Sequence, residues 1–275
     1  MIIYGRNPVK EALRGRRAPH VGEVWATSGA AREPWLANVP VRIAAAEEIE
    51  RRCGSPAHQG LCADAGPYPY VGVEELLAGE QPLLVALDQV QDPQNLGSIC
   101  RTAECAGAAG AVIPERRAAE VTAAVCKASA GAVEHLPIAR VRNLADFLVQ
   151  ARAAGCWCYG ASAPARHDSH ALESAAGPGA GERTAGGRTA GERTERRREG
   201  APPVAYDAPD YRGAGVVLVL GSEGKGLRPR VASACDQLIA LPLLGRVDSL
   251  GVSAAAAAIL YEILQARGGG LDRVP

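Results

Sequence analysis

The sequence predicts an α/β protein with two domains, a small N-terminal α/β domain followed by a larger α/β domain around a parallel sheet. The chain has 275 residues, more than one domain of ordinary size contains. In its second part, short apolar segments without polar alternation are separated by helical stretches. Strands of this kind are buried on both faces, as in parallel sheets covered by helices.

Residues 1–64 form the predicted N-terminal domain, in which helical and strand-like patterns alternate. In chain order, its predicted elements are helix 7–17, strand 22–27, helix 44–53 and strand 60–63. Between residues 65 and 80 the composition shifts to Gly, Pro and Tyr, which is typical of a linker. We therefore place the domain boundary in this segment.

Residues 81–275 form the predicted second domain, and most of its strand candidates are followed by helical stretches. The strand candidates are 83–87, 109–113, 135–139, 156–160, 216–220 and 238–241. Residues 177–200 break the pattern, because their Gly-, Glu- and Arg-rich near-repeat has no apolar periodicity. We predict that they form a disordered insert; the alternative is an RNA-binding arm.

Composition excludes several classes of protein. The 30 Lys and Arg residues balance 30 Asp and Glu residues, so the chain has no overall basic coat for polyanions. Its apolar runs are far shorter than the ~20 residues that a membrane span needs, and we expect no membrane partner. The N-terminus lacks a basic stretch followed by a long apolar core, which is the pattern of a signal peptide. We therefore expect the protein in the cytoplasm.

The cysteines do not predict a metal site. Eight cysteines are too few for a disulfide scaffold in a chain of this length, and no CxxC pair occurs. Cys156, Cys158, His167 and His170 are residue types that zinc accepts, but their spacing matches no common site. We expect free thiols and no metal.

Three segments place polar residues or glycines directly after predicted strands, where open α/β sheets bind their ligands. In the first, LDQVQDPQNLGSICRTA (87–103), Asn95 can cap a helix that carries Arg101. In the second, VLGSEGKGL (219–227), glycines allow positive φ and close approach of a ligand, with Glu223 beside them. Its spacing differs from the Walker A loop, so we expect no nucleoside triphosphate.

A third segment, LPLLGRVDSLGVS (241–253), leads into an alanine-rich helix. Ser253 is a suitable N-cap for this helix, which the glycines at 268–270 end. Side chains this small allow the helix backbone to pack closely against another element.

In this order, the three segments resemble the SpoU/TrmH branch of the SPOUT superfamily, the S-adenosylmethionine-dependent RNA ribose 2′-O-methyltransferases. Asn95 and Arg101 match the family's first motif, and residues 221–224 match its G-x-E-G turn. Residues 249–253 match its third motif, S-L-N-V-S, except that Gly251 occupies the Asn position. Gly can replace Asn where a turn needs positive φ, so we expect the protein to be active as it stands.

The N-terminal domain carries a second resemblance. Residues 4–9 (YGRNPV) and 58–60 (HQG) are similar to the substrate-binding domain that precedes the catalytic domain in the large-subunit (23S) rRNA guanosine-2′-O-methyltransferases of this branch. The two resemblances together cover nearly the whole chain outside the insert.

The resemblance implies a deep trefoil knot formed by the chain after Gly221, with S-adenosylmethionine bound in it. The implied cofactor-binding residues are Gly221, Gly224, Leu241, Leu250 and Ser253. The implied catalytic residues are Arg101, Asn95, Glu223 and Ser249. A guanidinium is almost never deprotonated, so we assign Arg101 to stabilising the developing alkoxide, held against Glu223.

The implied activity is methyl transfer to a ribose 2′-hydroxyl of RNA, with a guanosine of large-subunit rRNA as the expected target. Together with the alanine-rich helix, the resemblance predicts a homodimer. Two alternatives are a tRNA substrate and a non-catalytic RNA-binding paralogue in which Gly251 marks a decayed site. Binding of S-adenosylmethionine would separate an enzyme from the paralogue.

Overall fold

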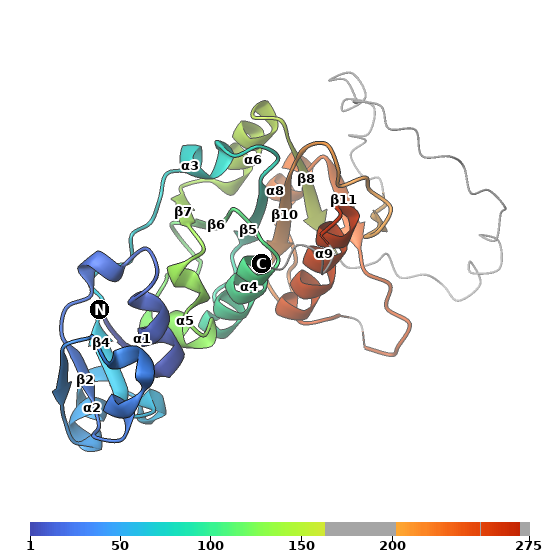
Figure 1. The fold of residues 1–275 in the computed structure, drawn as a ribbon. Helices are drawn as coiled ribbons and strands as arrows, with labels where there is room; N and C mark the ends of the chain where they lie inside the picture. Colours follow the sequence, from blue (N-terminus) through green and yellow to red (C-terminus); the bar gives the residue numbers. More distant parts are fainter. Residues whose placement is uncertain (163–201, 248, 270–275) are drawn as a thin grey trace.

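The structure, a computed structural model, describes residues 1–162, 202–247 and 249–269 (Figure 1). The predicted insert at 177–200, His167 and His170 lie outside the described residues. Within the described residues, none of the helices has the length and apolar character that crossing a bilayer requires. The N-terminal domain lies at one end of the molecule, next to α5 and the β7 edge of the larger sheet (Figure 1).

The N-terminal domain is built on a four-stranded sheet with the order β1-β4-β2-β3. Its strands are β1 (Ile2–Tyr4), β2 (Val24–Ala26), β3 (Val41–Ile43) and β4 (Leu61–Asp64). Its helices are α1 (Arg6–Ala12) and α2 (Ala46–Cys53). The sequence did not predict β1 and β3, which are only three residues long. Helix α1 ends five residues earlier than predicted, and beyond it the Arg16 amide bonds to the Glu134 carbonyl of the second domain (2.9 Å).

The second domain contains a seven-stranded sheet, parallel throughout, with the order β7-β6-β5-β10-β8-β11-β9. Its strands are β5 (Leu83–Asp88), β6 (Gly110–Pro114), β7 (Ile138–Val141), β8 (Cys156–Ala161), β9 (Val204–Ala205), β10 (Gly215–Gly221) and β11 (Gln237–Ala240). The predicted α/β class with a parallel sheet is therefore confirmed. The trefoil knot stays a prediction.

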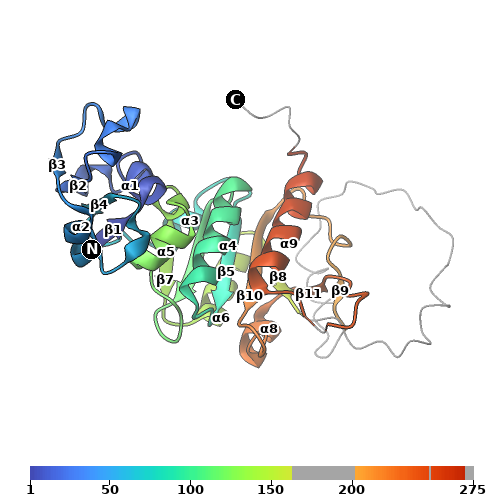
Figure 2. The ribbon, with the colours of Figure 1, turned by 90° about the horizontal axis from the view of Figure 1, so that it is seen from below.

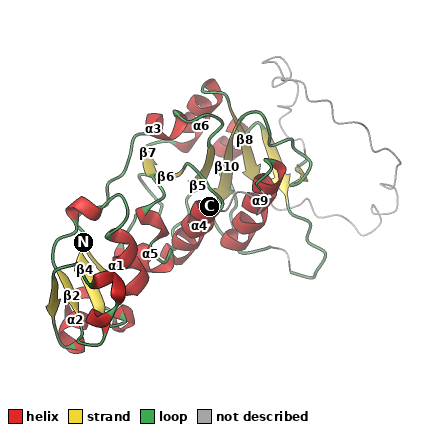
Figure 3. Cartoon of the chain, in the orientation of Figure 1, coloured by secondary structure: helices red, strands yellow, loops and turns green. Residues whose placement is uncertain are grey.

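Helices cover both faces of this sheet (Figure 3). One face packs against α4 (Pro93–Cys105), α5 (Ala123–Ala128) and α9 (Val252–Ala266). The other face packs against α3 (Val73–Leu77), α6 (Leu144–Ala153) and α8 (Pro229–Ala234). Figure 2 shows α4 and α9 side by side, and residues of the two helices contact each other.

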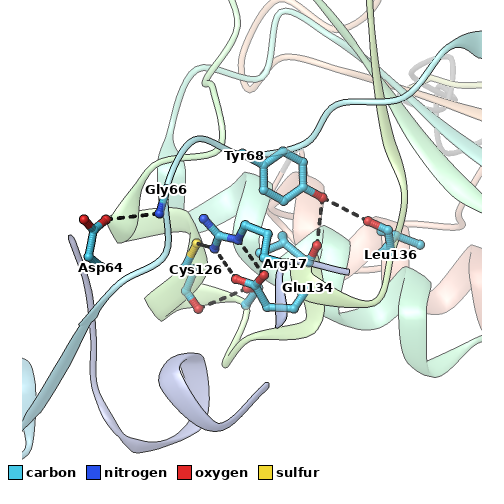
Figure 4. A network of polar contacts seen from close by, with 9 residues as sticks. Arg17, Asp64, Gly66, Tyr68, Cys126, Glu134 and Leu136 are labelled. Carbon is cyan, nitrogen blue, oxygen red and sulfur yellow. Dashed lines mark hydrogen bonds and ion pairs between the residues drawn. The ribbon is translucent and has the colours of Figure 1, made fainter. Parts of the chain in front are cut away.

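A buried ion pair joins the two domains (Figure 4). The Arg17 side chain from the N-terminal domain and the Glu134 side chain, in the short 3-10 helix after α5, are both 0% exposed. Arg17 Nε donates to Glu134 Oε2 (2.7 Å), and Arg17 Nη2 donates to Glu134 Oε1 and to Cys126 Sγ (3.3 Å). Burial alone would lower the pKa of Arg17, but the hydrogen bond and negative charge of Glu134 raise it. Arg17 therefore carries its positive charge.

The predicted linker, residues 65–80, packs onto the second domain. The Tyr68 hydroxyl donates to the carbonyl oxygens of Val133 (2.7 Å) and Leu136 (3.1 Å), and Arg17 lies over the Tyr68 ring (Figure 4). Val71 pairs with Ala139 of β7, and α3 begins two residues after Val71. The connection between the domains is thus a packed segment.

We expect Arg17→Met to lower the free energy of unfolding by about 3–5 kcal/mol, because it leaves the Glu134 carboxylate buried without its partner. Chemical denaturation measures this loss. The matched control is Arg16→Met, which removes the partly exposed pair with Glu75 (3.0 Å) and should cost at most about 1 kcal/mol. Equal effects of the two substitutions would show that the buried pair does not hold the domains together.

Candidate active site

A cavity of about 530 Å³ opens at the carboxyl ends of β8, β10 and β11. Its walls are formed by Ala161 at the end of β8 and Ser162 after it, by the turn that follows β10, and by the chain from β11 into α9. Parallel strands place their carboxyl ends at the same edge of a sheet, and ligands bind at this edge in open α/β folds. The cavity is therefore the candidate binding site of the described chain.

The turn after β10 depends on its glycines. Ser222 and Gly226 exchange two backbone hydrogen bonds (3.2 and 2.9 Å), which fold residues 221–226 back on themselves. A Cβ atom on Gly221 would lie 2.2 Å from the carbonyl carbon of Gly226, so a larger residue does not fit there. Gly224 has a φ of 78°, in the left-handed region that favours glycine. Glu223 is exposed beside Gly224 and lines the cavity.

The third predicted segment forms the opposite wall of the cavity. Leu241, Ser249, Leu250 and Gly251 line it, as do the first turns of α9. Our prediction of Ser253 as the N-cap of α9 is wrong. The N-cap is Gly251, whose carbonyl accepts a bond from the Ala255 amide (3.0 Å), because Val252 is already buried as the first helical residue.

Gly251 does not occupy a position that requires glycine. Its φ is −57°, so our expectation that positive φ explains this residue is wrong. A Cβ atom on Gly251 would meet only Glu223 Oε1, at 3.7 Å, an ordinary van der Waals contact. An Asn side chain therefore fits at position 251 and would begin beside the Glu223 carboxylate.

The two predicted residues of the first motif lie on α4 and do not line the cavity. Asn95 is not the cap of α4, because Pro93 occupies the first helical position and the Asp92 carboxylate caps the helix through the Gln94 amide (2.9 Å). Arg101 is exposed, and among the described residues its side chain has no hydrogen bond or ion pair. The expected contact with Glu223 is thus not formed in this structure.

The structure brings six of the nine predicted site residues to one cavity. These six are Gly221, Glu223, Gly224, Leu241, Ser249 and Leu250. Ser253, Asn95 and Arg101 do not line it. Ala161 and Ser162 also line the cavity and were not predicted, although their position directly after a predicted strand is a signal that could have indicated them.

The cavity can hold an amphipathic ligand but does not offer a cysteine nucleophile. Its apolar walls suit a flat ring, the glycine turn allows close approach to main-chain groups, and Glu223 supplies negative charge.

All eight thiols are free, as expected. Burial raises the pKa of Cys126 and of Cys235 to about 12, so both stay protonated near neutral pH. Among the described residues no cluster of three or more His, Cys, Asp or Glu could hold a metal ion.

Known proteins match both parts of the chain. Residues 82–261 match the SpoU rRNA methylase family, and residues 2–71 match the domain described as RNA 2′-O ribose methyltransferase substrate binding. A protein of Bacillus subtilis (strain 168), named as a TrmH family tRNA/rRNA methyltransferase, is 39% identical over 215 residues, which are 76% of this chain and 71% of that protein. A protein of the same description from Staphylococcus haemolyticus is 30% identical over 280 residues, 97% of this chain and 96% of that protein.

Two solved structures share the fold. The AdoMet-bound rRNA methyltransferase from Sinorhizobium meliloti has a TM-score of 0.68 and 24% identity, covering 96% of this chain and 86% of that one. The SpoU methyltransferase AviRb from Streptomyces viridochromogenes, in complex with AdoMet, has a TM-score of 0.68 and 22% identity, covering 98% of this chain and 91% of that one. With the fold, the turn after β10 and both family matches in agreement, the chain belongs to the SpoU rRNA methylase family.

Proposed function

We propose that the protein transfers the methyl group of S-adenosylmethionine to a ribose 2′-hydroxyl of RNA, and that the N-terminal domain positions this RNA. The observation that carries this proposal is a cavity at the carboxyl edge of a SpoU methylase sheet, in a chain that begins with the family's substrate-binding domain. A large-subunit rRNA guanosine is the target that we propose. The relatives are named for both tRNA and rRNA, so tRNA is the second candidate.

The cavity fits the proposed cofactor. Its volume of about 530 Å³ lies within the range of about 300–1,000 Å³ that is usual for small-molecule sites. Leu241 and Leu250 would cover the apolar faces of the adenine, and the backbone of the glycine turn would bond its polar edge. The Glu223 carboxylate would lie near the positive sulfonium. S-adenosylmethionine, when bound, supplies a methyl group that is already activated for transfer.

The protein's part in this reaction is mainly to align the hydroxyl and to stabilise its negative charge. A ribose hydroxyl is a poor nucleophile until its proton leaves. Arg101 carries a permanent positive charge, is exposed and has no hydrogen-bond or ion-pair partner among the described residues. We assign it to stabilising the developing alkoxide, with Asn95 and Ser249 as residues that position the ribose or its phosphate.

The proposal is tested by incubating the protein with methyl-labelled S-adenosylmethionine and unmodified rRNA and tRNA transcripts. We expect alkali-resistant label in RNA from the wild type. Arg101→Ala should lower the single-turnover rate by about 10²-fold or more, while the Kd for S-adenosylmethionine changes less than about twofold. The control, Arg230→Ala, removes an exposed arginine of α8 on the other face of the sheet and should keep the rate. An unchanged rate in Arg101→Ala would remove this residue from the mechanism.

We expect Gly251→Asn to change the rate constant by less than about tenfold, equivalent to ~1.4 kcal/mol. The backbone at position 251 suits either residue, and the new side chain meets only the edge of Glu223. The same transfer assay compares the two proteins. An inert wild type that Gly251→Asn revives would instead support the non-catalytic paralogue.

We also propose that the protein is a homodimer that associates through the loop between β11 and α9. Large apolar side chains are exposed there, with Leu244 92% and Val247 74% exposed, and Tyr261 is exposed on α9. Light scattering should report twice the 28.5 kDa of one chain. Leu244→Asp should shift the protein to a monomer, and Val149→Asp, at an exposed apolar residue of α6, should not. A fully active wild-type monomer would contradict the dimer.

A further inference from the structure

A buried carboxylate lies beneath the glycine turn without lining the cavity. Asp88, the last residue of β5, is 0% exposed, whereas the Arg228 side chain is 44% exposed. The Arg228 amide donates to Asp88 Oδ2 (2.8 Å), and its Nε donates to Asp88 Oδ1 (2.7 Å). Arg228 Nη2 lies 2.7 Å from Oδ1 as well. One arginine therefore satisfies both oxygens of the carboxylate, through its backbone and its side chain.

This pair closes the base of the turn. Gly221, where the turn begins, is the register partner of Asp88 in the neighbouring strand β5. Arg228, which follows the turn and caps α8, bonds to the side chain of the same Asp88. Both ends of the turn are thus attached to one residue. Between them, the turn is held by the two bonds that Ser222 and Gly226 exchange.

We infer that Asp88 and Arg228 are positioning residues, which hold residues 221–226 in the shape that binds the cofactor. The inference rests on the proposed function, because it assigns the turn to S-adenosylmethionine. Neither side chain lines the cavity, so the pair acts only through the turn. Glycines lose much conformational freedom on ordering, and a preformed turn spares the ligand that cost.

The geometry of the pair requires an arginine at position 228. A guanidinium offers several donors in a fixed plane, whereas a lysine ammonium is a point charge on a flexible stem. Arg228→Lys would keep the positive charge and the backbone bond but lose the second planar donor to Oδ1. Asp88→Asn would keep the shape of the side chain and replace one acceptor by an amide that faces donors.

We test the inference by measuring the Kd for S-adenosylmethionine by calorimetry and the steady-state constants on RNA. For Asp88→Asn and for Arg228→Lys, we expect the Kd and the KM for S-adenosylmethionine to rise about tenfold or more. The kcat at saturating cofactor should stay within about threefold of the wild type, because the bound cofactor orders the turn again, and the KM for RNA should not change. By contrast, a substitution that only destabilised the fold would lower the fraction of active protein and would not raise the KM for S-adenosylmethionine alone.

The matched control is Asp146→Asn, which breaks the exposed ion pair with Arg230 of the same helix α8 (3.0 Å) and should leave all constants unchanged. Wild-type affinity in both test variants, or a fall in kcat with unchanged KM, would overturn the inference. If Asp88→Asn does not fold, Arg228→Lys decides, since its side chain is half exposed. Failure of the wild type itself to bind S-adenosylmethionine would refute the proposed function instead.

Discussion

The buried ion pair between Arg17 and Glu134 determines where the substrate-binding domain sits relative to the cavity. Glu134 belongs to the short helix after α5, which contacts α4, and α4 in turn contacts α9, whose first turns line the cavity. One continuous apolar cluster runs through the same elements and into the N-terminal domain. Removal of either partner would leave the other buried without its hydrogen bonds, which is strongly destabilising. In the proposed function, RNA bound by the first domain would reach the site at a fixed place.

The parallel sheet and its helices could be predicted because buried strands leave a simple pattern, an apolar run between helical stretches. The predicted strand 135–139 was placed too early, since the 3-10 turn of residues 132–134 and Pro137 precede β7. The packing of residues 65–80 was not predictable either. Their Gly, Pro and Tyr composition is typical of a linker, and only the folded structure places Tyr68 against the carbonyl groups of Val133 and Leu136.

The candidate site was predicted where a motif follows a strand, and missed where partners are distant in sequence. The turn at 221–226 and Leu241 come directly after β10 and β11, so the strand pattern located them. Asp88 also ends a strand, but its partner Arg228 lies 140 positions away, and no local pattern connects them.

The predicted caps of α4 and α9 were misplaced because a local pattern does not decide between neighbouring residues. Several residues near each helix start can serve as caps, and packing selects among them, as burial of Val252 does for α9.

The structure of the protein with S-adenosylmethionine is the most direct measurement of the central claim, that the cavity at the carboxyl edge of the sheet is a cofactor site. We expect the adenine between Leu241 and Leu250, the backbone of residues 221–226 on its polar edge, and the sulfonium on the side of Glu223. Binding of S-adenosylmethionine elsewhere, with this cavity left open and the protein still active, would show that the cavity is not the cofactor site.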